Sequence, residues 1–167
     1  MIINDISDFL PYYDRAKART RRLLDLIPED RLEWSPKPGD FTLGDLVRHL
    51  ALLERQMFAE NAAGRPSLYK GCGSENAGSA KEVIQLFDRC QAESREIYAE
   101  LTPDRLRGKC RTPAGAEIST WKWLRALLEH EAHHRGQIYL YLRALGVTTP
   151  PLFGLTSEEV AAANADR

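Results

Sequence analysis

The chain has 167 residues, 43% of them hydrophobic, so it is long enough for one globular domain and too short for two of ordinary size. Its 23 lysine and arginine residues stand against 24 aspartate and glutamate residues, which gives a formal charge of -1. That balance argues against nucleic acid as a partner, because nucleic-acid-binding proteins present a strong positive field. We expect a single domain over residues 1–167.

The first predicted helix covers residues 7–27, where apolar side chains recur every three or four positions. Pro11 fits this helix only in the first turn, so the helix should begin near Ser7 or Asp8, and Pro28 should end it. Five basic residues between positions 15 and 22, Lys17 among them, are interpreted as a solvated surface, since acidic residues stand close to them.

The second helix is predicted over residues 42–63, with Thr42 as its N-cap and Gly64 as its C-cap. It follows a linker over residues 29–41 that two prolines and a glycine keep irregular. The glycine-rich connection over residues 64–79 is too long for a tight turn. It is long enough to cross the bundle or to cover an opening.

The third and fourth helices are predicted over residues 79–101 and 119–145, separated by a connection in which we see no strand alternation. Ser157 is predicted to cap a last short helix that runs through Ala163. The sequence therefore predicts an all-α fold, an antiparallel four-helix bundle with long connections and a short C-terminal helix.

The N-terminus and the cysteines indicate a cytoplasmic protein. The first residues, MIINDISDFLPYYDR, carry acids where a signal peptide has bases, and no run approaches the roughly 20 apolar residues of a membrane-spanning helix. Cys72, Cys90 and Cys110 are odd in number and lack CxxC spacing. We expect reduced cysteines and no membrane partner.

Three of the four histidines lie in the fourth predicted helix, in the sequence HEAHHRGQ. His130 and His134 are one turn apart on the same face as Trp123, Leu127 and Tyr141, so both imidazoles should point into the bundle. Two buried imidazoles need partners for four ring nitrogens, and a metal ion takes one nitrogen from each ring. The alternative is a pair of hydrogen-bonded histidines without a metal.

His49 is the candidate third ligand, because it lies on the second helix at the edge of the apolar stripe, and bundles build metal sites from inward residues on facing helices. Its alternative role is that of a hydrogen-bonded histidine at the edge of the core. Three neutral ligands leave coordination positions for water or a substrate atom. His133 points about 100° away from His134 and is not expected to bind the metal. Gln137 is a candidate substrate contact, and its place one turn beyond His134 also makes it a candidate for orienting a ligand.

The same segment also satisfies HExxH, the zinc-protease pattern, with Glu131 as the general base. Such a protease needs a third ligand further along the chain, and no histidine follows His134, so Glu158 or Glu159 would have to serve. Zinc proteases also hold the substrate backbone with a β-strand, which the sequence does not predict. A protease is the weaker alternative.

Two segments, WSPKPGDFTLGDLVRHL and LLEHEAHHRGQIYLYLRALG, resemble the DinB/YfiT-like superfamily of bacterial metal-binding bundles, which is unrelated to the translesion polymerase that shares the name DinB. The resemblance covers nearly the whole chain, and the order of four helices agrees with it. It implies that His49, His130 and His134 occupy the three ligand positions of the family. Imidazoles suit zinc, nickel, iron and copper, of which we expect zinc or nickel.

The resemblance also implies an activity. Characterised relatives include S-transferases and isomerases that use low-molecular-weight thiols such as bacillithiol, mycothiol or glutathione, and dimers are common among them. A metal-dependent thiol transferase that acts on a small electrophilic substrate, assembled as a homodimer, is therefore the leading hypothesis. The alternative is a non-catalytic metal-binding or stress-response module. The sequence itself identifies no thiol pocket.

Overall fold

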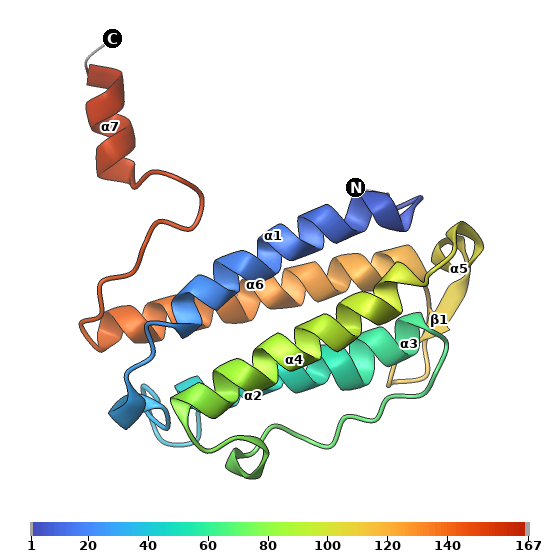
Figure 1. Ribbon diagram of the computed structural model, residues 1–167, viewed down its shortest axis with the longest axis horizontal. Helices are drawn as coiled ribbons and strands as arrows, with labels where there is room; N and C mark the ends of the chain where they lie inside the picture. The colour runs from blue at the N-terminus through green and yellow to red at the C-terminus, as the bar shows by residue number, and fades with distance from the viewer. Residues whose placement is uncertain (1, 166–167) are drawn as a thin grey trace.

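The computed structural model describes residues 2–165, and its main body is a bundle of four long helices (Figure 1). The elements in chain order are α1 (Ile6–Leu24), η1 (Glu29–Arg31), α2 (Leu43–Leu53), η2 (Glu54–Ala59), α3 (Glu60–Ala62), η3 (Ser74–Asn76), α4 (Ala80–Ala99), α5 (Pro103–Arg107), β1 (Lys109–Arg111), β2 (Glu117–Ser119), α6 (Thr120–Ala144) and α7 (Ser157–Ala165). The segments α2, η2 and α3 follow one another without a break and together form the second predicted helix. The predicted four-helix bundle with long connections is confirmed.

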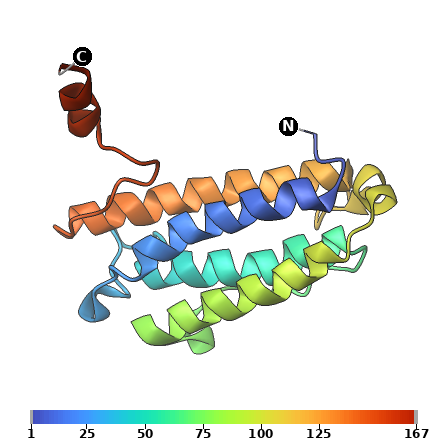
Figure 2. The ribbon, with the colours of Figure 1, turned by 45° about the horizontal axis from the view of Figure 1, so that its top comes forward.

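The directions of the helices follow from the lengths of the connections. α1 and α6 run in one direction, and α2 and α4 run in the opposite one (Figures 1 and 2). Between α3 and α4 the chain returns along the whole bundle, which only a long connection allows, and α4 then packs beside α2. The expectation that residues 64–79 are long enough to cross the bundle is confirmed.

Side-chain caps fix where the helices begin. The hydroxyl of Thr42 accepts the Asp45 N–H, and the Asp45 carboxylate accepts the Thr42 N–H in return, a capping box that fixes the start of α2 as predicted. In α1 the cap is Asp5, which starts the helix earlier than predicted. Pro11 therefore lies in the second turn, and its exposed ring faces solvent.

The segment between α5 and α6 was predicted to contain no strand, and this is wrong. β1 and β2 pair antiparallel, with Lys109 opposite Ser119 and Arg111 opposite Glu117. Each strand has only three residues, which is too short for the alternation of buried and exposed side chains to stand out in the sequence. Gly115, with a φ of +83°, forms the turn between them.

The π-helical segment η2 has a wider turn than the α-helices on either side of it, a feature often found at functional sites. It places Glu54 in the interior of the bundle. At the other end of the chain, α7 lies away from the bundle and has no buried residue (Figures 1 and 2). Its cap is Thr156 rather than the predicted Ser157. None of the helices described is long and apolar enough to cross a membrane.

Candidate metal centre

The structure brings His49, His130 and His134 together between α2 and α6. One ring nitrogen from each residue lies within 4.8 Å of the other two. The Nε2 atoms of His49 and His130 are 3.0 Å apart, and the ring centroids of His130 and His134 are 4.4 Å apart. Buried neighbours on the same helices, such as Leu46 and Leu127, hold the backbone of both helices in the core. Helices far apart in the sequence therefore direct all three imidazoles at one point.

Hydrogen bonds on the outer ring nitrogens orient two of the histidines. Nδ1 of His134 is 2.6 Å from Oε1 of Gln137, and because an amide oxygen only accepts, Nδ1 carries the proton and Nε2 keeps its lone pair. Nδ1 of His49 is 3.0 Å from the hydroxyl of Tyr69. Gln137 thus orients the candidate metal ligand His134, one of the two roles predicted for it. Tyr69 lies in the long connection, and nothing in the sequence pointed to it.

Burial keeps the three imidazoles neutral. Burial, together with the neighbouring His134 ring, lowers the pKa of His49 to about 4. Burial and the other histidines lower the pKa of His130 to about 3. The pKa of His134 is also lowered, chiefly by burial, although its hydrogen bond with Gln137 opposes the shift. At neutral pH each ring therefore has one nitrogen with a free lone pair for a metal ion and one N–H.

One pair of the three nitrogens lies near the spacing that a bound divalent metal ion requires, and the third nitrogen lies within 4.8 Å of both. Zinc–nitrogen bonds of about 2.0–2.1 Å in a tetrahedral arrangement place the nitrogens roughly 3.3 Å apart, close to the separation of the His49 and His130 Nε2 atoms. Within residues 2–165 no further His, Cys, Asp or Glu side chain joins this cluster. A bound ion would therefore keep its full charge and an open coordination position.

Aromatic side chains border the cluster. The ring centroids of Phe41 and His49 are 5.4 Å apart, and those of Phe58 and His130 are 5.6 Å apart. Phe58 in turn stacks on Trp123 at 4.5 Å. His133 is exposed and outside the cluster, as predicted. The apolar border strengthens electrostatic interactions at the centre, because it limits the approach of water.

Glu131 is not part of the histidine cluster, and this disfavours the zinc-protease alternative, in which Glu131 is the general base. Its side chain is 1% exposed and directed toward α1, where it accepts hydrogen bonds from Lys17 at 2.9 Å and from the Thr20 hydroxyl. A carboxylate held in this way is not free to take a proton from a water molecule at the histidines.

The interpretation of Lys17 as part of a solvated surface is wrong. Its side chain is 2% exposed, and its ammonium bridges the carboxylates of Glu54 and Glu131 at 2.7 and 2.9 Å. The Tyr13 hydroxyl donates a further hydrogen bond to Glu54. Periodicity places Lys17 on the inner face of α1, but only the two buried carboxylates explain why a charged residue stays there.

Gln137→Ala is expected to weaken zinc binding by about 10- to 100-fold, because it removes the acceptor that fixes the orientation and tautomer of His134. Competition with a chromophoric chelator measures the affinity. Gln85→Ala, on an exposed face of α4, is the matched control and should bind zinc like the unmodified protein. Equal affinity in the two variants would show that Gln137 does not support the ligand.

Zinc affinity is expected to fall at lower pH than at a site of histidines with the ordinary pKa of about 6.5, because the pKa values of all three ligands are lowered. A protonated imidazole cannot bind metal, so affinity falls as pH drops through the ligand pKa values. Since those of His49 and His130 are lowered to about 4 and 3, protons compete only well below the ordinary value of 6.5. Titration with a chelator at each pH tests this. A steep loss centred near pH 6.5 would contradict it.

Comparisons with known proteins agree with this architecture. The sequence model of the DinB superfamily matches residues 12–138, a span that contains all three histidines. The uncharacterized protein YjoA of Bacillus subtilis (strain 168) is 23% identical over 137 residues, which are 80% of this chain and 86% of that protein.

Solved structures share the fold. A DinB-like protein of Bacillus cereus superposes with a TM-score of 0.77 at 22% identity, over 90% of this chain and 99% of that one. YfiT of Bacillus subtilis, described as a probable metal-dependent hydrolase with an unusual four-helix bundle topology, gives 0.70 at 13% identity, over 89% and 91%. A mycothiol-dependent maleylpyruvate isomerase gives 0.64 at 13% identity, over 80% of this chain and 60% of that one.

Proposed function

The chain belongs to the DinB superfamily, and from this premise we propose that it binds one divalent metal ion through His49, His130 and His134 and catalyses thiol transfer to a small electrophilic substrate. The observation that carries the proposal is the convergence of three neutral imidazoles without a fourth protein ligand among the described residues. A non-catalytic structural metal site is usually closed by four protein ligands, whereas a catalytic site keeps a position open.

A divalent ion in such a site lowers the pKa of a thiol or a water molecule and so supplies a nucleophile at neutral pH. The protein side chains have separate tasks around it. The three histidines hold the ion, and Gln137 and Tyr69 fix the rings of His134 and His49. Zinc or nickel is the metal we propose, because both suit imidazole ligands.

Two of the structural relatives support a metal ion that takes part in a reaction rather than one that only stabilises the fold. YfiT is described as a probable metal-dependent hydrolase, and the isomerase depends on mycothiol, a low-molecular-weight thiol. Hydrolysis and thiol transfer need the same feature of the site, a nucleophile generated beside a substrate. We propose the thiol reaction, and the three free cysteines fit the cytoplasmic, reducing compartment in which such thiols are found.

The test supplies the zinc- and nickel-loaded protein with chlorodinitrobenzene and, in turn, bacillithiol, mycothiol and glutathione. We expect conjugate formation with at least one thiol, faster than with the metal-free protein and lost in His49→Ala. Release of a hydrolysed product without any conjugate would favour a hydrolase instead. If every pairing reacts at the metal-free rate, the proposed transferase is wrong.

We also propose a homodimer, formed through the outer face of α6. Leu140 and Phe153 are 66% and 75% exposed and line an open apolar groove of about 750 Å³ there. α7, with nine residues and no buried side chain, is shorter than an isolated helix needs to be stable in water, so a second copy that covers it would stabilise it.

Leu140→Glu should shift the mass measured by light scattering from dimer to monomer, whereas Leu68→Glu, at an exposed residue elsewhere, should not. A monomeric unmodified protein would contradict the proposal.

A further inference from the structure

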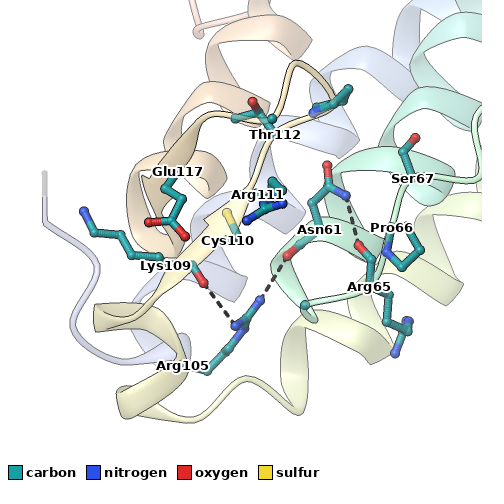
Figure 3. A pocket seen from close by; sticks show the side chains of 13 residues that line it. Asn61, Arg65, Pro66, Ser67, Arg105, Lys109, Cys110, Arg111, Thr112 and Glu117 are labelled. Atoms are coloured by element: carbon teal, nitrogen blue, oxygen red, sulfur yellow. Dashed lines mark hydrogen bonds between the residues drawn. The ribbon is translucent and has the colours of Figure 1, made fainter.

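A second cavity, of about 600 Å³, lies where α3, α5 and the β1–β2 hairpin meet (Figure 3). It is separate from the metal centre, because none of the three candidate ligands lines it. Thr120, the residue of α6 that follows the hairpin, precedes His130 by ten residues, which is about 15 Å along an α-helix. The volume is in the range of small-molecule sites.

Positive charge is concentrated in this cavity. Four cationic side chains and a single acidic one, Glu117, line it: Arg65, Arg105, Lys109 and Arg111 are the cations. The chain as a whole carries a formal charge of -1, so the concentration is local and does not follow from overall composition. Arg65 is neutralised by Glu60 at 2.5 Å. The positive charge of the cavity therefore comes from Arg105, Lys109 and Arg111.

Arg105 is fixed at the base of the cavity by backbone oxygens. Its guanidinium donates to the carbonyl oxygens of Ala62 at 2.7 Å, Asn61 at 3.1 Å and Lys109 at 3.2 Å. Gly64 makes this possible, since it has a φ of +85° and a Cβ there would lie 2.9 Å from Nη2 of Arg105. Among the described side chains no carboxylate lies within 4.0 Å of this guanidinium. Its charge is therefore held in place and not neutralised.

Lys109 and Arg111 come from the same face of β1. Alternation along the strand buries Cys110 and leaves its two neighbours exposed. Neither cation forms an ion pair with an acidic side chain of residues 2–165, although Glu117 is the cross-strand neighbour of Arg111. The hairpin thus adds two cations without an ion pair to the lining of the cavity, with the Lys109 side chain directed away from Arg105 (Figure 3).

Asn61 adds an unused acceptor. Its side chain is 3% exposed, and Nδ2 donates to the carbonyl oxygen of Arg65 at 3.0 Å. Oδ1 is buried and has no hydrogen-bond partner, and Figure 3 shows it directed away from Arg65. A buried acceptor without a partner is costly, so its place beside a cavity suggests that a ligand supplies the donor.

We propose that this cavity binds a small organic anion with two or more negative charges, carboxylate or phosphate, that also carries a hydroxyl or amino group. Arg105 and Arg111 bind the charged oxygens, since charge-assisted hydrogen bonds to guanidinium groups suit both kinds of oxyanion, and the unpaired ammonium of Lys109 adds to the attraction for an anion. Asn61 Oδ1 accepts from the hydroxyl or amino group. The site is independent of the metal centre and does not rest on the proposed function.

Calorimetric titration of the full chain in low-salt buffer with citrate, tricarballylate and pyrophosphate tests the site. We expect saturable binding of citrate or pyrophosphate, with the better of the two showing which oxyanion is preferred. Lys109→Gln/Arg111→Gln should weaken that binding by about tenfold or more. Lys81→Gln/Lys122→Gln changes the overall charge equally at exposed residues outside the cavity and should bind like the unmodified protein.

Two results would overturn the proposal: no saturable binding of any probe, or equal weakening in both double variants, which would mean nonspecific charge attraction. Tricarballylate lacks the hydroxyl of citrate. If the two bind equally well, the role given to Asn61 is wrong. Thermal unfolding of each variant, expected to match that of the unmodified protein, establishes that the fold is retained.

Discussion

His49→Ala is expected to lower zinc affinity by at least about a hundredfold, because it removes one of three ligands that α2 and α6 hold in one place. The remaining pair on α6 would bind as two adjacent histidines do on any helix surface. Chelator competition gives the affinity, and elemental analysis of tag-free protein gives the metal content. This is the largest effect we expect at the candidate metal centre.

His133→Ala is the matched control for that experiment. It removes a histidine from the same helix, with its ring 4.7 Å from that of His134, but from outside the cluster. Zinc content and affinity should stay at the level of the unmodified protein. No loss in His49→Ala would mean that His49 does not share an ion with His130 and His134. Equal loss in both variants would mean that the loss is not specific to the cluster.

Lys17→Met is expected to destabilise the protein by about 3–5 kcal/mol, because it leaves the carboxylates of Glu54 and Glu131 buried without their common cation. Urea denaturation measures the change in the free energy of unfolding. The triple variant Lys17→Met/Glu54→Gln/Glu131→Gln, with no charge left in the cluster, should recover part of the loss. Equal stability of Lys17→Met and the unmodified protein would show that the ion pairs contribute nothing.

The pH dependence of this loss has a definite sign. Burial already raises the pKa of Glu54 against the opposing charge of Lys17. Without the lysine, the carboxylate of Glu54 should bind a proton more readily in the folded state than in the unfolded one, because its pKa is raised further. Stability gained from that proton is present at low pH and lost as pH rises, so the deficit of Lys17→Met should be smaller near pH 5 than near pH 8.

Much of the bundle and the candidate ligands could be predicted because they depend on local, periodic signals. The cap at Thr42 and the spacing of His130 and His134 are readable from the sequence, since helical geometry fixes where these side chains point. His49 required one further step, the assumption that inward residues of facing helices meet, which the structure bears out.

The predictions that failed, and the features they missed, depend on contacts between distant segments. Tyr69 reaches His49 from a long connection whose path no periodicity describes. Lys17 has the same charge whether it is exposed or bridges two carboxylates, and no local pattern pairs it with Glu131, which is 114 residues away. Of the two roles predicted for Gln137, the contact with His134 depends on the orientation of that ring, which is set only in the folded protein.

Anomalous diffraction from crystals of the zinc-loaded protein tests the central claim most directly. We predict one peak between α2 and α6, at about 2.0–2.1 Å from a ring nitrogen of each of His49, His130 and His134, with a non-protein ligand at the remaining position. The claim would be contradicted by an ion bound to only two of these histidines, or by a fourth protein side chain that closes the coordination sphere.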